Sequence, residues 1–582
     1  MWRNYLLVTL RLMARHRIYT AINIGGLALG LAGCLLILNY VRVERSYDRW
    51  IPDHERVFAV QARWHEPGQP VTRSQASPFP VRDTLAAGFP QIEAISVFRT
   101  GQTVTSRDGQ PRFIDVAAVD PSFLDIVALP FAHGSAAGAF APDTVIVTER
   151  EARAAFGRTD VVGRAITLGA EDGRRDRRVT GVLKDLPSTT SLKFGILMRF
   201  NRGDYDGSPP DLTGWGSMDQ HHFVKLRSAA DAAAINAALP AWEKRTIPSE
   251  LIDGTRRTRA DILDLMLVPI ADVHLGEAQL AAMTPGGDPR ALAAFMLVAA
   301  LTLGMAMMNY VNLATARAAL RAREVGLRKL LGATRAKLIV QMLGESYLTT
   351  ALAMLFGLSI VELGTPWVAA WTGADLRISY FGEHGMALPA LTLFLVTGFA
   401  GGLYPAFYLS RFPPTTVLRA NRSVADTPGG GWLRTSLVVL QFAIAIGLIV
   451  STWVIYSQVR YGASADPGYR RDGLIQVDQA WRFAGQDSDF RLSSASCSKC
   501  LASSTSDVPI WASSRAIMCR RSRSPAGPGA CRSASTRSIQ GISPHSGRKS
   551  LPVARSAIDL PKTAWHVRSR GSRSPRAASS IS

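Results

Sequence analysis

The sequence predicts a membrane α-helical fold with an α+β extracytoplasmic domain, about five transmembrane helices and a disordered C-terminal tail. Five apolar stretches are each long enough to cross about 30 Å of hydrocarbon, and they lie at residues 21–41, 291–315, within 338–371, 386–409 and 436–456. Residues 44–288 contain no such stretch and are numerous enough to bury a core of their own. After about residue 491 serine and arginine dominate the composition.

The first apolar stretch carries no charge over 21 residues. A cleaved signal peptide is the alternative to a span, but the stretch is long and no small-residue cleavage site follows it. Ahead of it, apolar residues recur at helical spacing opposite Arg3 and Arg11, namely Trp2, Leu6, Leu10 and Met13. This pattern predicts a short amphipathic helix in the membrane interface, so that residues 1–43 comprise this helix and the first span.

Short strand-like and helical stretches alternate in residues 44–288. Residues 144–147 and 178–183 have the β-branched composition of strands, whereas 149–156 and 229–246 have helical patterns. The region is close to neutral, with 28 basic and 32 acidic residues, and it contains no cysteine. We therefore predict an α+β domain that does not depend on disulfides.

Loop charges predict the orientation of the spans. Four arginines precede the first span, seven basic residues against Glu324 alone lie in residues 317–337, and four arginines lie in residues 411–434. These three segments alternate correctly with five spans if all three are cytoplasmic. The N-terminus is then cytoplasmic, and residues 44–288 lie outside.

The net charge of +21 arises largely from the tail, where residues 491–582 contain 16 basic and two acidic residues. A nucleic-acid-binding protein would instead carry basic charge on a folded face with aromatic partners. We therefore expect no nucleic-acid partner.

Five stretches between the first and second spans carry a recognisable pattern, namely residues 44–49 at the exit of the first span, 115–124, 129–134, 145–157 and 179–187. Together they resemble the MacB-like periplasmic core domain, although Trp50-Ile51 stands where members of that family usually have Phe-His. Residues 309–317 and 323–335, with the order Arg-Glu-Val-Gly followed by Gly-Ala-Thr, resemble the signature of FtsX-like permease domains, as do 402–413 and 437–442. The resemblance to ABC transporter permeases of the MacB/FtsX-like family covers residues 1 to about 480.

In that family the signature segment forms a short cytoplasmic coupling helix that sits in a groove of an ATPase subunit. The resemblance therefore implies an ATPase-coupling site in this chain, formed by Arg323, Glu324, Val325, Gly326, Leu327, Arg328, Lys329, Leu330 and Gly332. A helix over residues 323–331 would combine apolar anchors with a charged rim, and Gly332 is a natural C-terminal stop. An ordinary positive-inside loop is the alternative.

The resemblance also predicts the domain organisation. Residues 44–288 are expected to form the periplasmic core domain, 289–410 an FtsX-like unit of three spans, 411–435 a cytoplasmic linker, 436–456 the fifth span and 457–490 the start of a truncated second periplasmic domain. The resemblance stops within that second domain, so we interpret residues 491–582, with 24 serines, as a low-complexity product of a reading-frame shift. A genuine basic tail is the alternative.

Catalytic and ligand-binding patterns are missing from the sequence. No Gly-x-x-x-x-Gly-Lys-Ser/Thr occurs, so we expect a partner subunit to bind ATP and this chain to be neither an enzyme nor a cofactor-binding protein. The pairs His221-His222 and Cys497-x-x-Cys500 do not form a metal-ligand cluster. We expect structural roles for Glu345 and Glu362 near the ends of the third span, and for Asn309 and Asn312 on one helical face.

Two functions are compatible with these patterns. The first is the membrane subunit of an ABC transporter in the bacterial inner membrane, which couples ATP hydrolysis by a partner to movement of its periplasmic domain for export or efflux. The second is a non-transporting FtsX-like signalling protein that regulates cell-wall hydrolases or senses peptides. In either case we expect an ABC ATPase and membrane lipid as partners, and a homodimer or a periplasmic adaptor is a further option.

Overall fold

The computed structural model describes residues 11–411 and 430–465, with gaps at 12, 66, 108–109, 137, 170–174, 203–211, 217–219, 253–254 and 383–384, and three strands between 474 and 520. The predicted N-terminal amphipathic helix lies mostly outside the described residues, and so do the linker at 412–429 and most of the tail. Two of the three strands fall in that tail. They are β15 (Ile510–Ala512) and β16 (Ala516–Arg520), and β16 pairs with β14 (Leu474–Asp478).

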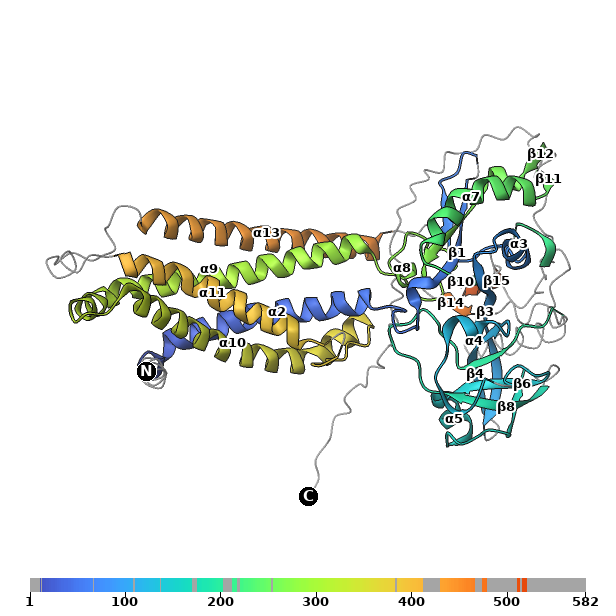
Figure 1. Cartoon of the computed structure of the whole chain (residues 1–582), viewed down its shortest axis with the longest axis horizontal. Coiled ribbons are helices and arrows are strands. Elements are labelled where there is room, and N and C mark those ends of the chain that lie inside the picture. Colours follow the sequence, from blue (N-terminus) through green and yellow to red (C-terminus); the bar gives the residue numbers. More distant parts are fainter. Residues whose placement is uncertain are drawn as a thin grey trace, which may run out of the picture. The chain divides into compact units, whose positions relative to one another are not determined.

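Five long helices account for the predicted spans: α2 (Arg17–Arg45), α9 (Pro289–Leu330), α10 (Arg335–Thr372), α11 (Ala387–Arg411) and α13 (Gly430–Ser464). Four of them contain stretches long and apolar enough to cross a membrane, at Arg17–Arg45, Pro289–Ala316, Arg335–Thr372 and Thr435–Ser464. The described apolar part of α11, Ala387–Leu403, is shorter. Helix α2 packs against α9 and α10, and α11 packs against both of these (Figure 1).

Small residues allow these helices to approach closely. Gly30 of α2 faces α9 so tightly that a Cβ atom placed on it would lie 2.5 Å from the Cβ of Ala306. In the same way, Gly398 of α11 leaves room for the ring of Tyr347 on α10. Apolar side chains such as Leu27, Leu31 and Leu35 fill the space between α2 and its neighbours. Such small-residue contacts are typical of helix packing in membranes.

Residues 46–288, which we call the sheet domain, form one mixed sheet with helices. The strands of the sheet are β1 (Val57–Trp64), β2 (Thr72–Ser74), β3 (Ile92–Arg107), β4 (Gln110–Val119), β5 (Phe131–Gly134), β6 (Thr144–Thr148), β7 (Ala165–Leu168), β8 (Arg175–Leu183), β9 (Ile196–Arg199), β10 (His221–Leu226) and β13 (Leu263–Pro269). Their order is β13-β1-β10-β3-β4-β9-β6-β8-β5, with β2 beside β1 and β7 beside β8. The pairs β4–β9 and β6–β8 are parallel, and the other pairs are antiparallel.

The helices of the sheet domain are α3 (Val81–Gly88), α4 (Phe123–Val127), α5 (Glu149–Phe156), α7 (Asp231–Thr246) and α8 (Ile270–Val273), with 3-10 turns at His54–Arg56 and Arg259–Asp261. A separate hairpin pairs β11 (Ser249–Ile252) with β12 (Thr255–Thr258). Helix α5 begins where the Thr148 hydroxyl accepts a hydrogen bond from the Glu151 N–H and ends at Gly157, whose φ is +74°. These elements confirm the predicted α+β class.

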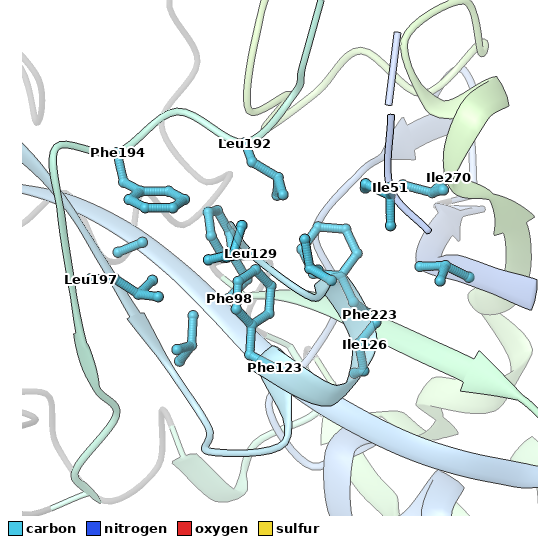
Figure 2. Packing of buried hydrophobic residues seen from close by; sticks show 14 of the residues in the cluster. Ile51, Phe98, Phe123, Ile126, Leu129, Leu192, Phe194, Leu197, Phe223 and Ile270 are labelled. Carbon is cyan, nitrogen blue, oxygen red and sulfur yellow. The ribbon is translucent and has the colours of Figure 1, made fainter. Parts of the chain in front are cut away.

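Four phenylalanines occupy the centre of one core cluster of the sheet domain. The rings of Phe123 and Phe223 lie 5.4 and 5.6 Å from the ring of Phe98, and Phe194 meets it edge to face at 6.3 Å (Figure 2). Their side chains come from β3, β10, α4 and the segment before β9, so burying them brings distant parts of the sequence together. A second cluster, which includes Trp242 of α7, packs against β1, β10 and β13.

Candidate functional site

The predicted coupling segment is the end of a long helix. Helix α9 runs without a break from Pro289 to Leu330, so the expected separate short helix over residues 323–331 is instead a continuation of the second span. The local sequence explains this difference, because residues 316–325 are mainly alanine, arginine, leucine and glutamate, which are good helix formers. The side chains of Arg323 and Glu324 lie outside the described part of the chain.

Three leucines at the end of α9 are exposed, and we call Leu327, Leu330 and Leu331 the leucine patch. Their exposed fractions are 55%, 56% and 81%, whereas Val325 is only 6% exposed. Positions i, i+3 and i+4 share one helical face, so these side chains form one apolar surface. Val325, which belongs to the predicted coupling site, is turned into the protein instead.

A tight corner after α9 holds the leucine patch in place. Gly332 has a φ of +89°, and its N–H donates to the Lys329 carbonyl while the Ala333 N–H donates to that of Arg328. This arrangement satisfies the last carbonyl groups of the helix and confirms the predicted stop at Gly332. Helix α10 then begins at Arg335, where the Thr334 hydroxyl accepts a hydrogen bond from the Lys337 N–H.

Basic residues border the leucine patch. The Arg328 guanidinium donates to the side-chain oxygen of Gln341 at 2.8 Å and so connects the end of α9 to α10. Partial burial and the nearby Arg335 lower the pKa of Lys329. Together with the corner at Gly332, these contacts position the patch between two helices rather than on a loose loop.

Polar residues within the helices have structural contacts. The side-chain amide of Asn312 on α9 donates to the Gln441 side chain on α13 at 3.4 Å, as expected for a residue that connects neighbouring spans. Glu345 accepts a hydrogen bond from Gln341 one turn earlier on α10. Glu362 accepts one from the Tyr380 hydroxyl at 2.6 Å, in the segment between α10 and α11.

The histidine pair lies in the core of the sheet domain. His221 and His222 are buried, and a ring nitrogen of His222 is 2.8 Å from the Ser77 hydroxyl. Burial lowers the pKa of His221 to about 4 and that of His222 to about 3. Within the described part of the chain, no group of three or more histidine, cysteine, aspartate or glutamate residues could hold a metal ion. Cys497 and Cys500 lie outside the described residues.

Two family profiles match the chain in the order of its folded parts. Residues 20–242 match the MacB-like periplasmic core domain, and residues 296–414 match the FtsX-like permease C-terminal region. The second match includes the leucine patch and the corner at Gly332. The chain belongs to the MacB/FtsX family of ABC transporter permeases.

Individual relatives and solved structures are similar to parts of this chain. The permease is 24% identical over 428 residues to the pyoverdine export ATP-binding/permease protein PvdT of Pseudomonas syringae pv. tomato, which covers 72% of this chain and 60% of that one. It is 30% identical over 122 residues to the uncharacterized ABC transporter permease YknZ of Bacillus subtilis, with coverage of 21% and 30%. Among solved structures, the periplasmic region of MacB from Actinobacillus actinomycetemcomitans aligns with a TM-score of 0.26 and 11% identity, over 38% of this chain and 92% of that one.

The permease therefore spans about 60% of the length of PvdT and less than a third of YknZ. It is a membrane protein with an extracytoplasmic domain, and this domain is the sheet domain. Its family is one of transporter permeases and not of classical enzymes.

Proposed function

We propose that this permease is the membrane subunit of an ABC transporter that binds a partner ATPase through the leucine patch. In this proposal the N-terminus and the leucine patch lie on the cytoplasmic side of a bacterial inner membrane, and the sheet domain lies on the periplasmic side. ATP hydrolysis by the partner moves the sheet domain, and this movement drives export or efflux. In this proposal the partner binds the ATP, in line with the lack of a Gly-x-x-x-x-Gly-Lys-Ser/Thr pattern in the sequence.

The exposure of the leucine patch is the observation that carries the proposal. Three leucines at one helix end are exposed, although apolar side chains of this size are usually buried. A helix that docks in a groove presents apolar anchors at this spacing, and Arg328 and Lys329 lie beside them to interact with acidic residues at the rim of the groove. The family signature in residues 323–335 supports the same surface.

Helix α9 offers a direct mechanical connection from this surface to the sheet domain. Its 42 residues correspond to about 63 Å at 1.5 Å per residue. The leucine patch lies at one end, and Pro289, which directly follows the sheet domain, begins the other. A displacement of the patch would therefore be transmitted along a single continuous helix.

Co-purification with the ATPase tests the proposal. The double variant Leu327→Asp/Leu330→Asp places two charges on exposed positions, so it is expected to fold normally and to lose at least about 90% of the bound ATPase, since each desolvated charge costs several kcal/mol. Val162→Asp/Leu280→Asp is the matched control, because these apolar side chains are also exposed but belong to the sheet domain.

Wild-type retention of the ATPase by the patch variant would reject the leucine patch as the docking surface. Val325→Asp would not separate docking from folding, because Val325 is buried and its substitution is expected to disturb the helix packing itself.

A further inference from the structure

Five residues gather where the first and second spans meet the sheet domain, and we call them the junction cluster: Glu44, Tyr47, Asp48, His274 and Gly287. Glu44 lies in the last turn of α2, and His274 directly follows α8. Both side chains are buried, and the carboxylate oxygen Oε2 of Glu44 lies 2.8 Å from Nε2 of His274. These two residues are 230 positions apart in the sequence.

The aromatic ring of Tyr47 covers the His274 imidazole. The two rings are stacked, with centroids 3.4 Å apart and an angle of 3° between their planes. The stacked rings lie directly beside the Glu44–His274 contact, and both side chains of that contact are buried. Because a hydrogen bond to a carboxylate is stronger in such a buried setting than in water, this contact holds the end of α2 firmly to His274.

Asp48, one residue after Tyr47, connects the end of α2 to residues 189–191 of the sheet domain. It is fully buried, and its φ of +57° is a left-handed conformation that aspartate tolerates. Its N–H donates to the Thr189 carbonyl at 3.0 Å, and its Oδ1 accepts hydrogen bonds from the Thr190 hydroxyl at 2.8 Å and the Ser191 N–H at 2.9 Å. Residues 189–191 lie between β8 and β9, so the end of α2 is also tied to that part of the sheet domain.

Gly287, just before the second span, connects this span to the junction cluster. Its N–H donates to the His274 carbonyl at 2.9 Å. A Cβ atom placed on Gly287 would lie 2.6 Å from Oε2 of Glu44 and 2.7 Å from Cδ2 of Leu275. Only a glycine can therefore approach this closely, two residues before α9 begins.

Apolar contacts beneath the junction cluster come from the same segments. One core cluster of the sheet domain contains a residue from each segment (Figure 2). Ile51 lies four residues after Tyr47, Leu192 directly follows Ser191, and Ile270 directly follows β13. Ile51 and Ile270 are each at most 1% exposed. The polar contacts of the junction cluster thus lie on a packed apolar base.

We infer that His274 is a positioning residue that holds the outer ends of α2 and α9 to one another and to the sheet domain. Its ring binds Glu44 of the first connection, while its carbonyl binds Gly287 of the second. A disturbance of either connection is therefore transmitted to the other within this cluster, through the two contacts of His274 and the close approach of Gly287 to Glu44. The role of this coupling in transmitting ATP-driven movement rests on the proposed function, whereas the coupling itself does not.

Hydrogen–deuterium exchange of the full chain in lipid nanodiscs, without ATPase or nucleotide, tests the inference. The Asp48 amide reports on the first connection and the Gly287 amide on the second, because each donates a hydrogen bond described above. Gly287→Ala is expected to make exchange at Asp48 about tenfold faster, although Asp48 is distant in sequence. Gly304→Ala is the matched control, because a Cβ atom there meets nothing within 4 Å.

The reverse experiment uses Glu44→Gln, which keeps the size of the side chain and an acceptor oxygen for Nε2 but removes the charge. Glu44→Gln is expected to make exchange at the Gly287 amide several-fold faster. If Gly287→Ala loosens the whole sheet domain, this second variant alone tests whether the two connections are coupled. Exchange that changes only within the substituted connection, in both variants, would overturn the inference. The proposed function can fail without affecting this result, because no ATPase is present.

Discussion

Glu243 is an ionisable residue whose titration the fold moves into the neutral pH range. Its side chain on α7 is buried against the edge strand β13, where Oε1 accepts a hydrogen bond from the Leu265 N–H at 2.6 Å. Burial raises the pKa of Glu243 to about 7, and the nearby Asp264 adds to this, although the hydrogen bond from Leu265 acts in the opposite direction. The fold thus favours the protonated form.

This raised pKa predicts a pH dependence of stability. Between the unfolded pKa of 4.5 and the folded value of about 7, the native state binds more protons than the unfolded state, so stability falls as the pH rises through that window. Glu243→Gln keeps the acceptor and removes the charge, so above pH 7 it is expected to be more stable than wild type by on the order of 3 kcal/mol. Near pH 4 the two should be equal.

Denaturant unfolding followed by tryptophan fluorescence measures this difference, because Trp242 adjoins Glu243 in α7. Glu277→Gln removes a carboxylate from the surface and is the control. If the difference in unfolding free energy between wild type and Glu243→Gln stays constant from pH 4 to pH 8, the raised pKa of Glu243 is contradicted.

Single residues were predicted from the sequence only where local pattern decides their environment. Gly332 was recognised as a helix stop because the residues before it are helical and glycine tolerates a positive φ. The burial of Val325 and the contact between Glu44 and His274 were not recognised. The contact between Glu44 and His274 joins residues 230 positions apart, and periodicity carries no information about such contacts.

Helices and strands with strong patterns were predicted well. The strand over residues 144–147 and the helix over 149–156 correspond to β6 and α5. Helix α9 shows the limit of the approach, because the sequence predicts a span at 291–315 and a separate short helix at 323–331, whereas one helix covers both. Helical propensity extends the helix beyond the hydrophobic part, to Leu330.

The contact between α2 and α9 leads to a prediction at the scale of elements. Gly30→Ala would place its Cβ atom 2.5 Å from the Cβ of Ala306, so the helices must separate, at a cost of about 1–3 kcal/mol. The thermal midpoint of the full chain in detergent is expected to fall. Gly33→Ala on the same helix meets no atom within 4 Å and is the control.

The compensating double variant Gly30→Ala/Ala306→Gly removes the methyl group of Ala306 from α9 and places one at position 30 of α2. It is expected to recover part of the lost stability, since the space at the contact is restored while a glycine in α9 costs up to about 1 kcal/mol. A Gly30→Ala midpoint equal to that of Gly33→Ala would show that the two helices do not pack as described.

At the scale of the whole molecule, the predicted combination of membrane helices and an extracytoplasmic α+β domain was correct. Composition and apolar stretches suffice for this because a membrane span has a minimum length and the sheet domain lacks such a stretch. The reading-frame interpretation of residues 491–582 stays a prediction, and most of these residues lie outside the described part of the chain. How the leucine patch and the junction cluster are related could not be predicted, because one helix joins them only in the folded chain.

In the proposed function, a partner ATPase moves the sheet domain by acting on α9. Hydrogen exchange of the complex of the full chain with its ATPase, in nanodiscs, tests this when ATP-trapped and nucleotide-free samples are compared. We expect ATP trapping to protect the leucine patch and also to change exchange at Asp48 and Gly287, at the opposite end of α9, by about tenfold. Changes confined to the ATPase and the leucine patch, with identical exchange at Asp48 and Gly287, would contradict this expectation.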